Sequence, residues 1–393
     1  MSNAAIVADG QRVQAPGRAL AKVVTWRAER IADPVERLGY LRSSAAFLGR
    51  KPVRSALADA RLHRVSAFLA FSMLLPVPMI TDGAAPRRTV QAASKADAFA
   101  NVWTVDDAQD HTLYSNGLRV EKKFQAAPRA AMKFQRWRID TGAREESPGP
   151  YGIVFHTTES DTAVYEESNN RRLRRAAEGT AGFVQSQRAY HFVIDKFGRV
   201  FRTVPENEPA NHAGASVWAD EKYFFVNMNH SFLGVSFDGQ SRGPDGRPSV
   251  TEPQIQSARL LTEVLRSRDR IPASNCVTHA QVSVNTSNMG VGYHTDWAAG
   301  FPFARLGLPV NYLTPLPAIT QFGFGFEDYY SNLAADELQD GISAGETILR
   351  QDAMRRGLST AAYRKFLAKR FRDVEDPHRY IAFSEPETRS SNQ

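Results

Sequence analysis

Histidines are concentrated in one part of this 393-residue chain, because six of the nine lie between residues 156 and 294. Imidazole and carboxylate groups are zinc ligands, and a catalytic zinc site takes three protein ligands and leaves a fourth position for water. No pair of these histidines has the spacing that puts two ligands on one helical turn, so a metal site would have to be assembled from distant segments. The single cysteine, Cys276, excludes an internal disulfide and a CxxC metal site.

Strand patterns place several of these histidines. The apolar run 152–156 predicts a buried strand that ends at His156. Residues 190–204 predict a hairpin, and alternation along its first strand would place Tyr190 and His191 on opposite faces of the sheet.

Helix and turn signals are interleaved with these strands. The run 233–237 predicts another buried strand, and Thr251 with Gln254 forms a capping-box spacing before apolar residues at helical period. Asn-Gly at 116–117 predicts a hairpin whose two turn residues both need φ > 0, so folded β-structure should begin near Asn101. This order predicts an α/β fold with a central mixed β-sheet flanked by helices.

Five pieces of sequence then occur in a familiar order. They are 153–158 (IVFHTT), 190–198 (YHFVIDKFG), 211–214 (NHAG), 233–237 (LGVSF), and His279 followed by 294–303 (HTDWAAGFPF). Together they resemble the zinc-dependent N-acetylmuramoyl-L-alanine amidases, the family of phage lysozyme-type amidases and peptidoglycan recognition proteins. The resemblance covers roughly residues 145 to 310 and implies that family's mixed sheet with flanking helices.

The resemblance also implies zinc as the cofactor, with His156, His279 and Asp296 as the metal ligands. The stretch between His279 and Asp296 is longer than the family usually shows, so His294 is an alternative third ligand. Asp296 is favoured because it keeps its register with the 301–303 motif.

Further roles follow from the same resemblance. Tyr190 matches the active-site tyrosine, and His294 stands where many members have a lysine that stabilises the oxyanion. Ser236 replaces a glutamate that one branch uses in catalysis, so we expect this chain to rely on Tyr190. Asn211 and His212 are expected to bind substrate.

The implied activity is zinc-dependent hydrolysis of the amide between N-acetylmuramic acid and L-alanine in peptidoglycan or its fragments. A non-catalytic, receptor-like peptidoglycan-binding protein is the alternative, although such proteins characteristically lose a metal ligand. An unrelated zinc hydrolase acting on another amide is a third hypothesis.

Charge and hydropathy single out the N-terminal part of the chain. Residues 1–64 hold 12 Lys and Arg and 5 Asp and Glu, and this surplus of positive charge equals the whole formal net charge of +7. The remainder of the chain is therefore neutral, and nucleic-acid binding is not expected. The uncharged run 65–80 follows basic residues and is shorter than the roughly 20 residues of a membrane span, which indicates a secretory signal or a membrane-associating segment. A buried core helix is the other interpretation.

We therefore expect a protein of the periplasm or cell envelope, with a cytoplasmic location as the alternative. The expected organisation is a basic extension at 1–64, the hydrophobic segment at 65–84, a linker at 85–100, the amidase domain at 101–315 and a helical appendage at 316–393. Within the appendage, two amphipathic helices should be separated by a break at 357–360.

Overall fold

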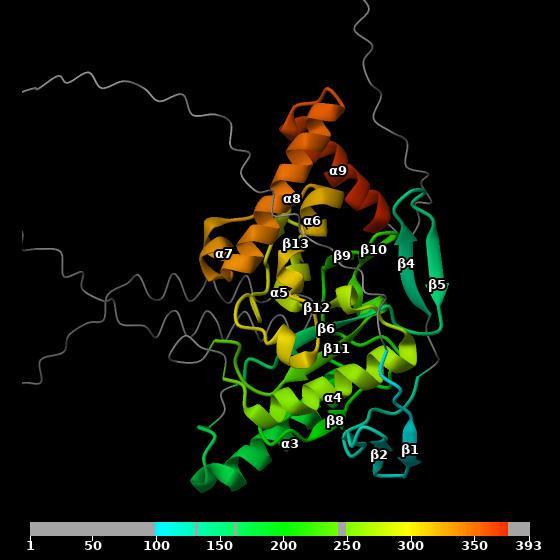
Figure 1. The fold of residues 1–393 in the computed structure, drawn as a ribbon, viewed down its shortest axis with the longest axis vertical. Helices are drawn as coiled ribbons and strands as arrows, with labels where there is room; N and C mark the ends of the chain where they lie inside the picture. The colour runs from blue at the N-terminus through cyan, green and yellow to red at the C-terminus, as the bar shows by residue number, and fades with distance from the viewer. Residues whose placement is uncertain (1–98, 130–132, 161–162, 243–248, 376–393) are drawn as a thin grey trace, which may run out of the picture. The chain divides into compact units, whose positions relative to one another are not determined.

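The computed structural model describes residues 99–129, 133–160, 163–242 and 249–375 (Figure 1). These residues belong to the compact unit Asp97–Gln393. The predicted extension at 1–64, the hydrophobic segment at 65–84 and most of the linker lie outside the described residues. Among the residues that are described, no helix is long and apolar enough to cross a membrane.

An eight-stranded mixed sheet positions the candidate site, with spatial order β1-β2-β3-β8-β7-β11-β6-β12. Its strands are β1 Thr104–Asp107, β2 His111–Tyr114, β3 Arg119–Glu121, β6 Gly152–Thr157, β7 Phe192–Ile194, β8 Val200–Arg202, β11 Phe232–Phe237 and β12 Cys276–Thr278. The neighbours β7, β11, β6 and β12 run parallel to one another. Their carboxyl ends therefore meet at one edge of the sheet, where open α/β sheets bind ligands.

Strand β6 is buried on both faces, which explains its continuous apolar sequence. Ile153 and Phe155 belong to the larger hydrophobic cluster, whereas Val154 belongs to a second, smaller one. Because side chains alternate along a strand, His156 lies on the Val154 face. The predicted strands at 152–156 and 233–237 are both confirmed.

The two predicted hairpins are present, but one turn differs from the expectation. β7 and β8 pair antiparallel around Gly198, whose φ is +79°. Between β2 and β3, the Tyr114 N–H donates to the Leu118 carbonyl (2.9 Å), which leaves a three-residue loop. In that loop Gly117 alone has a positive φ, +87°, so the prediction that both Asn116 and Gly117 adopt φ > 0 was wrong. A three-residue loop needs only its last residue in the left-handed region.

Helices and a second sheet surround the large sheet. The helices include α3 Asn170–Gln187, α4 Glu252–Asp269 and α5 His279–Val282, with 3₁₀ turns at Glu167–Asn169, Met228–His230, Ala273–Asn275, Phe303–Leu306 and Asn311–Leu313. The second sheet has the order β5 Arg144–Ser147, β4 Phe134–Arg138, β10 Tyr223–Val226, β9 Val217–Ala219, and β13 Val284–Asn285 pairs with β14 Gly290–Val291. The predicted capping box of α4 is confirmed, and its Gln254 amide donates to the Ile194 carbonyl (2.9 Å), which joins α4 to β7.

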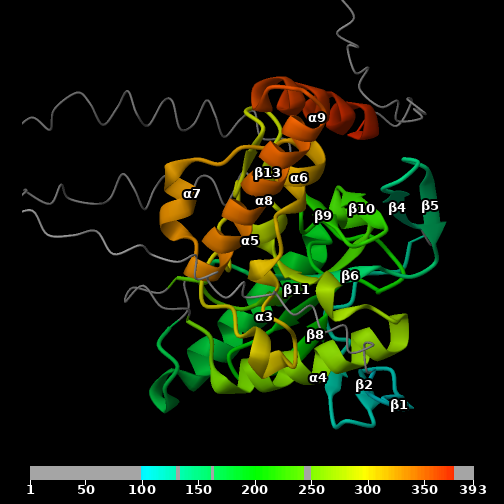
Figure 2. The same cartoon turned by 45° about the horizontal axis from the view of Figure 1, so that its top comes forward.

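The C-terminal region is helical, as predicted, with α6 Pro317–Phe322, α7 Asp328–Leu333, α8 Asp336–Arg355 and α9 Thr360–Glu375. The predicted break falls between α8 and α9. These helices lie at the opposite end of the described unit from α3 and α4 (Figures 1 and 2). Phe322, Leu338 and Phe371 nevertheless belong to the same hydrophobic cluster as Phe155, so this region shares a core with the sheet. The proposed boundary at 315/316 stays a prediction.

Candidate metal centre

Two neighbouring parallel strands carry His156 and His279 to the same edge of the sheet. His156 is the fifth residue of β6, and His279 directly follows β12, which pairs with β6 from Cys276↔Ile153 to Thr278↔Phe155. Thr278 and Gln281 form a capping box that turns the chain from β12 into α5 at His279. Strand pairing thus brings together two histidines that are 123 positions apart in the sequence.

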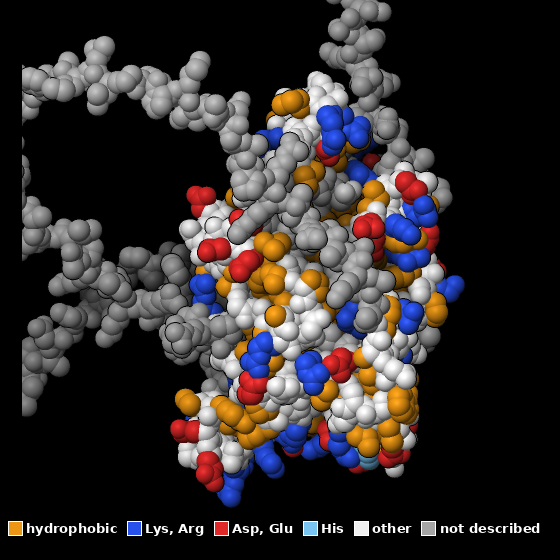
Figure 3. All heavy atoms as spheres, viewed as in Figure 1, with side chains coloured by type: hydrophobic (Ala, Val, Ile, Leu, Met, Phe, Trp, Pro, Cys, Tyr) orange, Lys and Arg blue, Asp and Glu red, His pale blue; other side chains and the backbone are white. Residues whose placement is uncertain are grey.

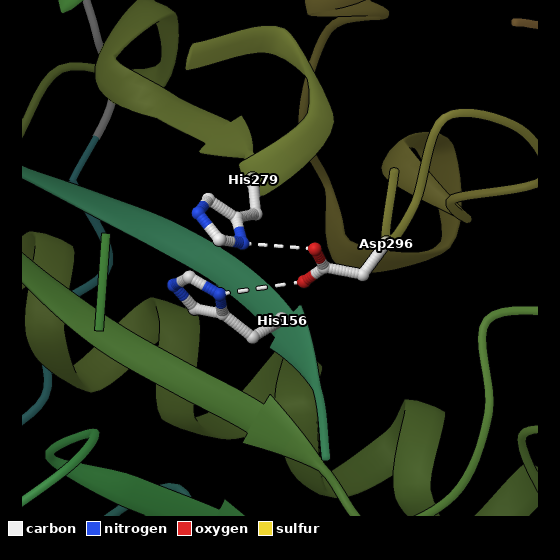
Figure 4. A group of neighbouring side chains, drawn as sticks. All are labelled: His156, His279 and Asp296. Atoms are coloured by element: carbon white, nitrogen blue, oxygen red, sulfur yellow. Dashed lines mark hydrogen bonds and ion pairs between the residues drawn. The ribbon is translucent and has the colours of Figure 1, made fainter. Parts of the chain in front are cut away.

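Asp296 reaches the two histidines from the loop that follows the β13–β14 hairpin (Figure 4). Its backbone carbonyl accepts a hydrogen bond from the Ala280 N–H in α5 (3.1 Å). Its carboxylate lies beside the two rings and faces both, with Oδ1 2.8 Å from Nδ1 of His279 and Oδ2 3.4 Å from Nδ1 of His156. Potential ligand atoms of all three residues lie within 4.8 Å of one another, and all three side chains are buried.

The protonation states of this cluster suit a cation. Burial, followed by the neighbouring His279, lowers the pKa of His156 to about 4, so its imidazole is neutral at pH 7. Burial acts to raise the pKa of Asp296, but His279 and His156 together hold it well below its usual range. One ionised carboxylate and neutral imidazole are ligands of zinc.

One orphaned atom supports the same fit. Nδ1 of His156 is fully buried and has no hydrogen-bond partner among the described residues, although it faces the Asp296 carboxylate. A buried polar atom without a partner costs about 1–3 kcal/mol unless something satisfies it. The donor set therefore fits a divalent metal ion.

The two catalytic candidates lie on either side of the histidine pair. The Tyr190 ring centroid is 5.0 Å from that of His156, and His294 stacks on His279 at 4.6 Å with an interplanar angle of 21°. Both side chains are half-buried. Tyr190 has a φ of +53°, so the predicted strand alternation at 190–191 does not apply, and β7 begins only at Phe192.

The substrate candidates are placed differently from each other. Asn211 is exposed, and its amide donates to the Gln187 carbonyl (3.2 Å) at the end of α3 rather than to a residue of the cluster. His212 is buried, with Nδ1 3.1 Å from Nε2 of His156. Ser236 pairs with His156 across β11 and β6, and its buried hydroxyl has no partner among the described residues. No carboxylate therefore stands at that position beside His156.

Sequence reasoning missed the residues that support the ligand-bearing loops. Tyr330 of α7 donates from its hydroxyl to the Ala280 carbonyl (2.5 Å), and the Tyr312 hydroxyl donates to the Trp297 carbonyl. No local pattern signals such long-range contacts. Gly234, in the middle of β11, did carry a signal, because glycine inside a strand marks a close approach of other atoms.

Comparison with known proteins points to one family. Residues 146–296, which include all three clustered residues, match the family model "N-acetylmuramoyl-L-alanine amidase". No curated protein matches the sequence.

Several solved structures are similar over part of the chain. The N-acetylmuramoyl-L-alanine amidase LysC from Clostridium intestinale has 22% identity, covering 40% of this chain and 83% of its own, with a TM-score of 0.26. AmpDh3 from Pseudomonas aeruginosa, solved in complex with an anhydromuramic pentapeptide, has 20% identity, covering 57% and 73%, with a TM-score of 0.31. The Drosophila peptidoglycan recognition protein SD has 17% identity, covering 40% and 79%, with a TM-score of 0.26.

Proposed function

We propose, from the premise that residues 146–296 form a domain of the N-acetylmuramoyl-L-alanine amidase family, that this protein is a zinc-dependent enzyme. Its reaction would be hydrolysis of the amide between N-acetylmuramic acid and L-alanine in peptidoglycan or its fragments. The observation that carries this proposal is the buried cluster of His156, His279 and Asp296 inside the matched domain.

These three residues would hold the metal. Zinc bound there would act as a Lewis acid and lower the pKa of a coordinated water to about 7. The protein's part is to keep the ligands in place, and the Asp296 carboxylate does so by contacting both rings. The paired parallel strands β6 and β12 hold the backbone of the two histidines in place.

The flanking residues would act on the substrate. His294, stacked on His279, would donate a hydrogen bond to the oxyanion that develops on the scissile carbonyl. Tyr190, next to His156, would orient the attacking water and assist proton transfer. This assignment leaves the proton transfer to Tyr190, because Ser236 supplies no carboxylate beside His156.

Peptidoglycan or a muropeptide is the proposed partner. We also propose that the protein works in the periplasm or cell envelope, where intact peptidoglycan lies. Support for this location comes from the uncharged run 65–80 and the basic residues before it.

Mass spectrometry of defined muropeptides incubated with the zinc-loaded protein tests the activity. The expected products are a free stem peptide with an L-alanine amino terminus and a sugar with a free lactyl carboxylate, and none with His279→Ala. Binding of muropeptide without these products would favour the receptor-like alternative. Cleavage of a different amide would favour an unrelated zinc hydrolase.

A further inference from the structure

The imidazole of His212 lies between a metal-ligand candidate and a backbone carbonyl. Its Nδ1 is 3.1 Å from Nε2 of His156, and its Nε2 is 3.0 Å from the carbonyl oxygen of Phe232. The side chain is buried, with 8% of the residue exposed. Both ring nitrogens therefore have their partners inside the protein.

These contacts determine where the protons are. A carbonyl oxygen can only accept, so Nε2 of His212 must carry the hydrogen that is shared with Phe232. A neutral imidazole has one N–H, so Nδ1 of His212 is an acceptor. Nε2 of His156 must then be the donor, which leaves the lone pair of His156 on Nδ1, the atom that faces Asp296.

We infer that His212 is a positioning residue that holds His156 in the tautomer whose Nδ1 can bind a metal ion. Ligand histidines commonly use their second nitrogen to donate to a fixed acceptor, and such acceptors contribute to metal affinity. The acceptor here is a second imidazole, itself oriented by the Phe232 carbonyl. This inference rests on the metal site of the proposed function.

The surroundings of His212 are shaped to hold its ring. The Asn229 side-chain oxygen accepts hydrogen bonds from the backbone N–H groups of His212 (2.8 Å) and Ala213 (2.7 Å), which fixes the loop. A Cβ atom added at Gly234 would lie 2.6 Å from Cγ of His212. The glycine in β11 is therefore required for the ring to lie against the strand.

A pair of substitutions separates tautomer control from space filling. In His212→Asn the side-chain oxygen can take the place of Nδ1 and accept from His156. In His212→Gln the amide reaches the place of Nε2, so it keeps the bond to Phe232 and loses the one to His156. A role in packing alone predicts that the longer Gln is tolerated at least as well as Asn.

The readouts are the zinc dissociation constant, measured by competition with a chelator, and the tautomer of His156 in the metal-free protein, measured by ¹⁵N NMR. We expect His212→Gln to raise the dissociation constant about 10- to 100-fold and His212→Asn to stay within a few-fold of the wild type. His111→Gln, in β2 near the opposite edge of the sheet from β6 and β12, is the matched control and should change neither the dissociation constant nor the tautomer of His156.

Equal losses of affinity in the Asn and Gln variants would overturn the inference. So would a hydrogen on Nδ1 of His156 in the metal-free wild type, a measurement that needs no variant to fold. Absence of turnover by a zinc-loaded wild type would contradict the proposed function and leave this inference standing, because neither readout is activity.

Discussion

At the scale of single residues, an ionised carboxylate, that of the candidate ligand Asp296, lies among neutral buried imidazoles. His156, His191 and His212 are all buried, and burial is the first cause that lowers the pKa of each. A buried imidazole that stays neutral can accept a hydrogen bond or a metal at one nitrogen while it donates at the other. His191 does so with protein groups, because its Nδ1 accepts from the Gly234 N–H (2.9 Å) and its Nε2 faces the Glu208 carbonyl (2.8 Å).

His191 should therefore make stability depend on pH. Burial lowers its folded-state pKa to about 4 from 6.5, so between these pH values the unfolded chain binds a proton that the folded protein does not. The free energy of unfolding should be unaffected by this group above pH 6.5 and fall as the pH drops towards 4, by on the order of 3 kcal/mol. Urea unfolding of the metal-free protein should show a shallower decline in His191→Gln. Identical pH profiles for both proteins would contradict this.

His294 is predicted to act on the substrate and not on the metal. Removing one oxyanion donor typically lowers kcat by about two to three powers of ten. We expect that loss in His294→Ala, and we expect His294→Lys to remain active. Steady-state turnover of a muropeptide measures kcat in each variant. A wild-type kcat in His294→Ala would show that His294 only stacks on His279 and does not act on the substrate.

At the scale of elements, two candidate ligands come from the sheet edge and one from a loop, and two of the three segments that carry them are supported from outside the matched residues 146–296. α7 contributes Tyr330, which is 1% exposed and whose ring leaves no room for a side chain at Gly292, where a Cβ atom would lie 2.1 Å from it. The Ala335 N–H, just after α7, donates to the Ala298 carbonyl (2.9 Å). The C-terminal helices thus hold the segments on both sides of Asp296.

Loss of the Tyr330 contact should loosen the centre. Tyr330→Ala removes a buried ring and its bond to the Ala280 carbonyl, which should lower the free energy of unfolding by about 3–5 kcal/mol and weaken zinc binding. Tyr329→Ala, on the same helix but 67% exposed, is the matched control and should change stability by less than about 0.5 kcal/mol. Urea denaturation measures the free energy of unfolding of both variants. A loss in Tyr330→Ala no larger than that in Tyr329→Ala would show that the Tyr330 contact does not support the site.

Elements that depend on residues close together in the sequence were predictable, and those that depend on distant residues were not. The strand at 152–156 and the capping box at Thr251 depend on residues at most a few positions apart, and both are present. The backbone at Tyr190 was misjudged, because its left-handed conformation ends the alternation that its neighbours suggest, although its ring does lie beside His156. The contact of Tyr330 joins α7 to α5, which lies about 50 residues earlier in the sequence, and no local pattern in either segment predicts it.

At the scale of the whole molecule, charge is distributed unevenly along the chain. The formal surplus lies in residues 1–64, whereas on the face of the described unit seen in Figure 3 basic and acidic side chains are interspersed. The proposed export would explain the basic residues at 1–64 and the uncharged run 65–80.

Export gives a prediction for the native host. Fractionation followed by immunoblotting should find the protein in the periplasm or envelope. Protein that is confined to the soluble cytoplasm and retains residues 1–84 would contradict export and favour a role on recycled wall fragments. A cytoplasmic marker enzyme in the same fractions controls for lysis.

The claim on which the account depends most is that His156, His279 and Asp296 together bind one zinc ion. Zinc per chain, measured by mass spectrometry of the purified and dialysed protein, tests it directly. We predict about one zinc in the wild type and in His294→Ala, and nearly none in His156→Ala, His279→Ala or Asp296→Ala. Full zinc occupancy in Asp296→Ala together with its loss in His294→Ala would contradict the account, because the third ligand would then be His294.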